Sequence, residues 1–317
     1  MTTRDVTLVD IRAAAGRIAP YVHRTPVMSS QLINEAAGCE IQFKCENLQK
    51  VGAFKARGAH NAILCLAGDR RANGVATHSS GNHAAALALA AAQFDLSAYI
   101  VMPANAPATK VAAVQAYGGD ITFCEPTLAA RETTLAEICA RTGAEFVPPY
   151  DHPDVIAGQG TTALELAEQV DPAPDFLLAP VGGGGLLAGC AVAGKALLPG
   201  TLVIGAEPAG ADDARRSFRS GVWQPQQAPQ TVADGLLTSL GQLNFSLIRQ
   251  HVDDILCADD AAIISAMRLV WTRMKLLIEP SAGVGLAVVL SHPQRFAGKR
   301  VAIVLSGGNV DIDRLPW

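Results

Sequence analysis

Lys55 is the residue of this sequence whose type and setting first suggest chemistry. It stands in QKVGAFKARGAHNA (residues 49–62), directly after an apolar Val-Gly-Ala-Phe run and two residues before an arginine. Taken alone, this window favours a surface lysine with a partly buried stem, because lysine is mostly an exposed residue. In a dry site, however, burial lowers the pKa of a lysine and leaves a neutral amine that can act as a base or form a Schiff base.

Four consecutive glycines, residues 182–185, stand in PVGGGGLLAG between an expected strand and an expected helix. Backbone N–H groups that no side chain covers can converge on an anion at a helix start, where the helix dipole also favours negative charge. The pattern therefore predicts a phosphate-binding loop. Gly183, Gly185 and Ala188 also satisfy a GxGxxA fingerprint, and Glu207 falls at the end of the next expected strand, so a nicotinamide- or flavin-dependent oxidoreductase is an alternative from another class.

Two more turns offer polar groups at places where strands are expected to end. HSSGNHAAAL carries five consecutive candidates at a helix start: Ser79, Ser80, Gly81, Asn82 and His83. One such residue would suffice to cap the helix, so the run of five favours a site for a substrate carboxylate. The apolar strand in VLSGGNVD ends at Ser306, whose hydroxyl could bond a ring nitrogen.

Glu207 and Asp213 stand six residues apart in GAEPAGADDA, with the carbonyl of Ala211 between them. Hard oxygen ligands at close range suit Mg²⁺ or Ca²⁺. The alternative is an exposed acidic turn, which is the more common explanation for such a pattern.

The elements that must position these residues alternate between short β-branched runs and Ala- and Leu-rich segments, as in 74–96 and 174–197. This alternation predicts an α/β protein with a largely parallel sheet. Ligands collect at the carboxyl ends of the strands of such sheets, so the four turns are expected to converge. Residues from about 74 to 152 form a compact βαβ set, and the remainder is expected to form a larger layer.

The composition is that of a globular protein that acts on small molecules. The chain has 317 residues, of which 50% are hydrophobic and 17% charged, with a net charge of -4 and a pI near 6.0. A small negative net charge provides no positive electrostatic field that would attract nucleic acid or an acidic membrane. Seven scattered cysteines without a CxxC pair indicate reduced thiols, and no signal-peptide or membrane-spanning run is visible, so we expect a cytoplasmic protein.

Taken together, these stretches resemble the fold type II pyridoxal-phosphate enzymes, in particular the serine racemases and the threonine, serine or 3-hydroxyaspartate dehydratases. GAFKARGA is similar to the family's Schiff-base lysine motif, SSGNH to its substrate and cofactor-ring loop, GGGGLLAG to its phosphate loop and SGGN to its pyridine-nitrogen turn. VIAGQGT, ADG at 233–235 and RMKLLIEPSAGVGLA also match. The motifs occur in the family's order along nearly the whole chain.

The resemblance implies a tryptophan synthase β-like fold, with two open, twisted, mostly parallel sheets and helices on both faces. Residues 1–73 and 154–317 would form the large cofactor-binding domain, and 74–153 the small domain. The resemblance also implies a homodimer, pyridoxal 5'-phosphate as cofactor, and a divalent cation (Mg, Mn or Ca) bound by Glu207, Ala211 and Asp213.

The resemblance also implies the roles of the site residues. Lys55 would carry the internal aldimine, Asn82 would bind the cofactor's 3-hydroxyl, Ser306 the ring nitrogen, and Ser80 would face the substrate Cα opposite Lys55. The cofactor-binding set would be Phe54, Lys55, Asn82, Gly182, Gly183, Gly184, Gly185, Leu186 and Ser306. The substrate-binding set would be Ser79, Ser80, Gly81, Asn82, His83, Arg131 and Gly235.

The chemistry that follows is loss of a β-substituent from an amino acid. Once the substrate amine displaces Lys55, this lysine is free to take the Cα proton. The neutral hydroxyl of Ser306 cannot keep the ring nitrogen protonated, which disfavours a long-lived carbanion and favours prompt loss of a β-hydroxyl. We therefore predict an ammonia-lyase that converts 3-hydroxyaspartate, serine or threonine to a 2-oxo acid and ammonia.

Two alternatives to this lyase stay open. Serine racemisation needs a second acid or base on the opposite face, and Ser80 is available to pair with Lys55 in that role. A non-catalytic binding module is the third class.

Within the family, three positions bear on the substrate. Ala53 before Phe54 is similar to the serine racemases and 3-hydroxyaspartate dehydratases, whereas threonine dehydratases typically have serine there. Pro148 stands where many relatives have histidine, and His60 is unusual in the helix after Lys55. A β-carboxylate on the substrate would need a further cation, for which Arg131 and His60 are the candidates.

Overall fold

A computed structural model describes residues 4–317 of the chain. Its larger sheet has six strands in the order β1-β2-β10-β7-β8-β9. β1 pairs antiparallel with β2, and the other neighbours pair in parallel. The bounds are β1 (Val27–Met28), β2 (Glu40–Cys45), β7 (Phe176–Pro180), β8 (Leu202–Pro208), β9 (Asp254–Ala258) and β10 (Arg300–Leu305).

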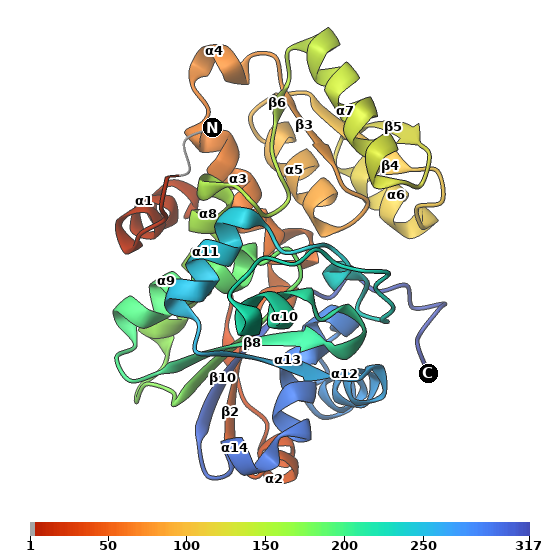
Figure 1. The fold of residues 1–317 in the computed structure, drawn as a ribbon. Coiled ribbons are helices and arrows are strands. Elements are labelled where there is room, and N and C mark those ends of the chain that lie inside the picture. The colour runs from red at the N-terminus through yellow and green to blue at the C-terminus, as the bar shows by residue number, and fades with distance from the viewer. Residues whose placement is uncertain (1–3) are drawn as a thin grey trace.

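The smaller sheet has four parallel strands in the order β5-β4-β3-β6. It lies apart from the larger sheet, with α3 and α8 near the boundary between the two (Figure 1). The bounds of its strands are β3 (Val75–His78), β4 (Ala98–Pro103), β5 (Asp120–Cys124) and β6 (Glu145–Phe146).

Helices connect the parallel strands and cover the sheets. The α-helices are α1 (Leu8–Ile18), α2 (Gln31–Ala37), α3 (Lys55–Cys65), α4 (Gly68–Arg71), α5 (Asn82–Ala92), α6 (Ala108–Ala116), α7 (Leu128–Thr142), α8 (Pro153–Gln169), α9 (Gly185–Leu197), α10 (Asp213–Ser220), α11 (Gln242–His251), α12 (Asp260–Met274), α13 (Pro280–Ser291) and α14 (Pro293–Phe296). Short 3-10 turns are η1 (Glu46–Leu48), η2 (Lys50–Gly52), η3 (Ala209–Ala211) and η4 (Asp234–Leu236).

None of the helices in the described part of the chain combines the length and apolar character needed to cross a bilayer.

Alternate side chains of the central strand β10 enter two different hydrophobic clusters. Val301 and Ile303 pack with residues of α2, α12 and α13, whereas Ala302 and Val304 pack with residues of α1, α8, α9 and α11. Successive side chains of a strand point to opposite faces, and a parallel sheet is covered on both, which explains why its strands read as continuous apolar runs. The predicted α/β fold with two mostly parallel sheets and helices on both faces is therefore confirmed.

The smaller sheet is built in the same way. The alanine-rich α5 is buried along most of its length and packs with α3 and with side chains such as Ile100 and Met102 of β4. On the opposite face, Leu135 and Ile138 of α7 pack on Ala76 and Val101. The assignment of 74–153 to a small domain, and of 1–73 with 154–317 to a large one, stays a prediction.

Candidate active site

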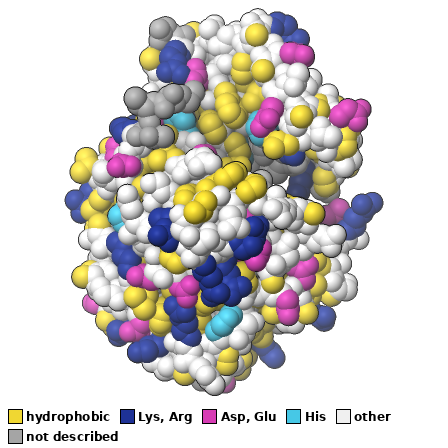
Figure 2. All heavy atoms as spheres, viewed as in Figure 1, with side chains coloured by type: hydrophobic (Ala, Val, Ile, Leu, Met, Phe, Trp, Pro, Cys, Tyr) yellow, Lys and Arg dark blue, Asp and Glu magenta, His cyan; other side chains and the backbone are white. Residues whose placement is uncertain are grey.

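A cavity of about 550 Å³ lies where loops of the two sheets meet. It is lined from the smaller-sheet side by the turn after β3 and by α6 and α7, and from the larger-sheet side by the turns after β7 and β10. Lys110 of α6 forms an ion pair with Asp234 of η4, and both residues line the cavity. Elsewhere, acidic and basic side chains are interspersed over the face of the molecule that Figure 2 shows, in keeping with the small net charge.

The structure brings every residue predicted to contact cofactor or substrate to this one cavity. The lining includes Phe54, Lys55, Ser79, Ser80, Gly81, Asn82, His83, Arg131, Gly182, Gly183, Gly184, Gly185, Leu186, Gly235 and Ser306. The reason is topological, because the carboxyl ends of parallel strands share one edge of each sheet. The individual roles of these residues stay predictions.

Lys55 is the first residue of α3, and its amine reaches the cavity wall. Its Nζ donates a hydrogen bond to the backbone carbonyl of Pro149 at 2.6 Å and lies 5.1 Å from the ring centroid of Phe54. Burial lowers the pKa of Lys55 from 10.5 to about 8, partly offset by the negative charge of Glu279. The lowered pKa increases the neutral fraction of the amine, which suits a group that must attack an aldehyde.

The start of α3 is tied to the end of β10. Ala53 forms an isolated antiparallel bridge with Gly307, and the N–H of Phe54 donates to the carbonyl of Ser306 at 3.1 Å. Lys55 and the Ser306 hydroxyl are therefore held on neighbouring segments, although 251 positions separate them in the chain.

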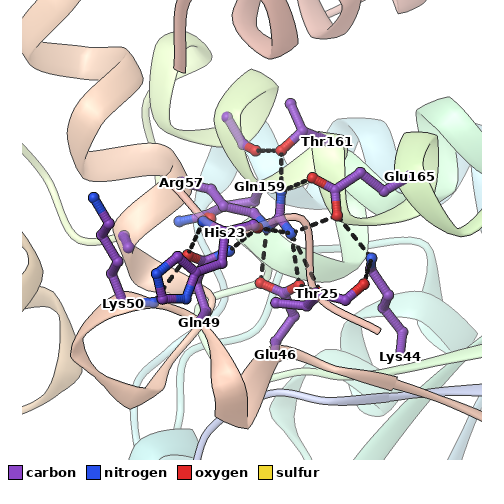
Figure 3. A network of polar contacts seen from close by, with 12 residues as sticks. His23, Thr25, Lys44, Glu46, Gln49, Lys50, Arg57, Gln159, Thr161 and Glu165 are labelled. Carbon is purple, nitrogen blue, oxygen red and sulfur yellow. Dashed lines mark hydrogen bonds and ion pairs between the residues drawn. The ribbon is translucent and has the colours of Figure 1, made fainter. Parts of the chain in front are cut away.

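A buried ionic network anchors α3 two residues after Lys55 (Figure 3). Arg57 is 0% exposed, and its guanidinium donates to both oxygens of Glu46 (2.7 and 2.8 Å) and to both oxygens of Glu165 (2.7 and 2.9 Å). Lys44 donates to the same Glu165 at 2.7 Å. Paired, hydrogen-bonded charges of this kind are costly to disrupt, so the network holds α3 against α8 and η1.

The glycine loop between β7 and α9 leaves no room for side chains. A Cβ on Gly182 would lie 2.9 Å from the Cα of Leu236, and one on Gly183 would overlap the ring of Tyr150. Gly184 has a φ of +94°, which favours glycine. The N-cap residue of α9 is Gly184, which has no side chain to cap the helix, so the first N–H groups of α9 can bind an anion.

The SSGNH stretch does not cap α5 with its side chains. The N-cap of α5 is Gly81, without a side-chain cap hydrogen bond, so Ser79 and Ser80 keep their hydroxyls at the cavity. This arrangement removes the capping explanation for the five polar residues. The first N–H groups of α5 and the two hydroxyls together suit a substrate carboxylate.

His83 lies at the cavity but is only 2% exposed. Burial lowers its pKa to about 3, so the ring is neutral, and its Nε2 lies 3.1 Å from the carbonyl of Val147. A carbonyl requires a donor, so Nε2 carries the proton, and Nδ1, which has no hydrogen-bond partner within residues 4–317, is an acceptor. In this state His83 offers no donor to a carboxylate, and the serines are better suited to that task.

Of the two cations considered for a β-carboxylate, only Arg131 lies at the cavity. It is on α7, its Nε contacts the carbonyl of Thr127 at 3.4 Å, and it forms no ion pair with a described carboxylate. His60 is 0% exposed, and its ring nitrogens lie 2.6 Å from the carbonyl of Ala56 and 2.8 Å from Oε1 of Gln93. His60 does not line the cavity and packs in the interior, so the hypothesis that it supplies a cation to the substrate β-carboxylate is wrong.

Several cavity residues were not identified from the sequence, and two of them, Tyr150 and Glu279, contact predicted site residues. Tyr150 packs over Gly183, and its backbone carbonyl accepts a hydrogen bond from Asn244 at 3.3 Å. Glu279 is 5% exposed, and burial raises its pKa from 4.5 to about 7. The sequence signal that could have identified Glu279 is that it is the only acidic residue in the apolar stretch LLIEPSAG.

The predicted metal ligands lie outside the cavity, between the end of β8 and the start of α10, so the prediction that all four turns converge is wrong for this turn. Glu207 and Asp213 are 0% exposed and Ala211 is 1% exposed, so the alternative of an exposed acidic turn is wrong. Glu207 accepts hydrogen bonds from the N–H groups of Ala214 and Arg215, both at 2.8 Å. Across residues 4–317, no group of three or more His, Cys, Asp or Glu side chains is arranged to hold a metal.

The cavity fits pyridoxal phosphate in its size and in its chemical groups. Lys55 offers an amine for the aldehyde, the uncapped glycine loop offers N–H groups for the phosphate, and Ser306 offers a hydroxyl for the ring nitrogen. All three lie in one space large enough for a small ligand.

Comparison with known proteins agrees with this fit. Residues 18–307 match the family described as pyridoxal-phosphate dependent enzyme. The chain is 50% identical over 311 residues to the beta-hydroxyaspartate dehydratase of Paracoccus denitrificans, covering 98% of both chains. It is 47% identical to the L-threo-3-hydroxyaspartate ammonia-lyase of Saccharomyces cerevisiae, covering 97% of this chain and 94% of the relative.

The solved structures of similar proteins have the same fold. The crystal structure of serine racemase from Dictyostelium discoideum superposes with a TM-score of 0.92 at 46% identity, covering 97% of this chain and 99% of that one. The fold, the cavity and the sequence similarity over nearly the whole length agree, and the chain belongs to the pyridoxal-phosphate dependent enzyme family.

Proposed function

We propose that this protein is a pyridoxal-phosphate-dependent ammonia-lyase that dehydrates a β-hydroxy amino acid, with 3-hydroxyaspartate as the preferred substrate, to a 2-oxo acid and ammonia. The observation that carries this proposal is the presence in one cavity of the Lys55 amine, the glycine loop and the Arg131 guanidinium, which forms no ion pair with a described carboxylate. Two relatives that act on hydroxyaspartate support it. Membership of this family sets aside the dinucleotide-dependent oxidoreductase.

Each residue has a task in this reaction. When bound, the cofactor supplies an electron sink for the negative charge that develops at the substrate Cα. Lys55 holds the cofactor and then takes the Cα proton with its neutral amine. The glycine loop binds the phosphate, and Ser79 and Ser80 orient the substrate carboxylate. The Ser306 hydroxyl hydrogen-bonds the pyridine nitrogen of the cofactor and, because it is neutral, adds no negative charge there.

A product assay tests the proposal. Purified holoprotein is incubated with 3-hydroxyaspartate, serine and threonine, and both 2-oxo acid and ammonia are measured. The holoprotein should absorb at about 410 nm, and borohydride should fix the cofactor to Lys55. A colourless protein that binds NAD would contradict the proposal and support a nicotinamide-dependent oxidoreductase. A coloured protein without turnover would support a non-catalytic binding module.

Substrate choice is expected to depend on Arg131. Arg131→Gln removes a cavity-lining guanidinium that forms no ion pair with a described carboxylate, so kcat/KM for 3-hydroxyaspartate should fall about 10- to 100-fold. The value for serine, which has no β-carboxylate, should change by less than about threefold. The matched control is Arg141→Gln, an exposed arginine on the last turn of the same helix. An equal fall for both substrates would show that Arg131 does not recognise the β-carboxylate.

Serine racemisation is the second candidate function. Ser80 and Lys55 both line the cavity, and a structurally similar serine racemase shares 46% identity with this chain. Chiral analysis of serine recovered from the product assay tests this activity. If Ser80 is the second acid or base, Ser80→Ala should lose racemisation by a larger factor than it loses ammonia release.

We further propose a structural divalent cation, Mg, Mn or Ca, bound by Glu207, Asp213 and the carbonyl of Ala211. The support is that both carboxylates are fully buried without an ion pair to any described Lys or Arg, and that all three ligands are hard oxygens. EDTA should lower the Tm of the wild-type protein by several degrees, because a ligand that binds only the folded state stabilises it. Glu207→Gln should abolish this response. If EDTA alters neither Tm nor rate, the site holds no cation.

Two expectations stay predictions. A homodimer predicts about twice the mass of the 33.0 kDa chain in light scattering. The cytoplasmic location also awaits a test.

A further inference from the structure

Glu279 reaches into the cavity from the start of α13 and contacts Asn82. The Asn82 Nδ2 lies 3.0 Å from one carboxylate oxygen of Glu279 and 3.2 Å from the other. Glu279 forms no ion pair with a described Lys, Arg or His, so the amide of Asn82 is its side-chain hydrogen-bond partner within residues 4–317. The contact joins residues 197 positions apart.

The other end of the Asn82 amide is held by Asn309. The Asn309 Nδ2 donates to Oδ1 of Asn82 at 2.9 Å and to the carbonyl of Val51 at 2.6 Å. A backbone carbonyl and an ionised carboxylate can only accept hydrogen bonds. The chain of contacts from Val51 through Asn309 and Asn82 to Glu279 therefore has one direction, with the oxygen of Asn82 facing Asn309 and its nitrogen facing Glu279.

The amide nitrogen of Asn82 carries two N–H groups. Its two contacts with Glu279 involve the two oxygens of one carboxylate, so a single N–H can serve both as a bifurcated donor. Since Asn82 lines the cavity, the second N–H is available to a ligand there. If the amide were reversed, an oxygen would face the ligand instead, and it could not donate a hydrogen bond to a ligand oxygen.

We propose that Glu279 is a positioning residue that orients the Asn82 amide so that this amide presents an N–H donor to the 3-hydroxyl oxygen of the cofactor. This inference rests on the cofactor-binding role of Asn82 in the proposed function. It assigns to Glu279 no contact with the substrate and no proton transfer.

Glu279 is also placed to set the position of the Ser306 turn. Its N–H donates to the carbonyl of Gly307 at 3.0 Å, and a Cβ on Gly307 would lie only 2.8 Å from Oε1 of Glu279. Glycine at 307 thus permits the close approach of the carboxylate. Glu279 therefore contacts both of the segments that carry Asn82 and Ser306, the two residues proposed to bind the pyridine ring of the cofactor.

The test is a double-mutant cycle on cofactor affinity. Apoproteins of wild type, Glu279→Gln, Asn82→Ala and the double variant are titrated with pyridoxal phosphate at about pH 8, above the raised pKa of Glu279 near 7. Glutamine keeps the size of Glu279 but offers both a donor and an acceptor, so the orientation of the Asn82 amide is no longer fixed from the side of residue 279 and depends on the contact with Asn309 alone. We expect each single variant to bind about tenfold more weakly and the double variant to match Asn82→Ala within about twofold.

Additive losses in the double variant would overturn the inference, as would wild-type affinity in Glu279→Gln. The matched control is Glu168→Gln, which removes the same charge from an exposed ion pair with Arg24 and should bind the cofactor like wild type. The Tm of each apoprotein shows whether it is folded. If the wild-type protein itself binds no pyridoxal phosphate, the proposed function fails, which separates that outcome from failure of the role of Glu279.

Discussion

Lys55→Ala is expected to lower ammonia-lyase turnover by a factor on the order of 10³ or more, because it removes both the attachment point of the cofactor and the base at the substrate Cα. The glycine loop remains, so the variant should still bind pyridoxal phosphate without a covalent bond. The band at about 410 nm should be absent, and borohydride should leave no label on the protein. Absorption spectra, mass spectrometry after borohydride and the product assay measure these effects.

The control for this prediction is Lys299→Ala, which removes an exposed lysine near the start of β10. It should keep the visible band and the turnover of the wild type. A Lys55→Ala protein that retained a borohydride-stable label would place the Schiff base on another lysine and would contradict the assignment of the site.

Arg57→Met is expected to lower the free energy of unfolding by about 3–5 kcal/mol, since it leaves the carboxylates of Glu46 and Glu165 without their main partner in a buried position. Arg57 and Glu46 are both 0% exposed in their side chains, so water does not replace the lost hydrogen bonds in the folded state. The pairing also keeps the pKa of the Glu165 carboxyl below its usual value. Urea denaturation of the apoproteins, followed by far-UV circular dichroism, measures the change.

Arg24→Met is the matched control for Arg57→Met. Arg24 pairs with Glu168 at 2.6 Å, but both side chains are 54% exposed. Exposed pairs contribute little, so the loss should stay below about 1 kcal/mol. Equal effects of the two variants would mean that the network around Arg57 does not anchor α3.

Much of the fold and of the cavity could be predicted from local sequence. The apolar runs of β7 and β10 are typical of strands covered on both faces, and the buried alanines of α5 mark a helix enclosed by other elements. Each predicted ligand-binding turn directly follows such a strand. Since parallel strands end at a common edge, the turns after β3, β7 and β10 were predicted to converge, and they line the cavity. The turn after β8 was predicted to join them and does not, and Lys55 was placed with them by the family resemblance.

What the sequence determined by itself was therefore the set of chemical groups and the strand ends on which they stand. The tertiary structure decided which of them touch. It placed Arg131 at the cavity and His60 in helix packing, and it brought Glu279 to Asn82. Hydrogen bonds between residues 197 positions apart depend on how two sheets and their helices pack, and no pattern within a short window of sequence encodes that geometry.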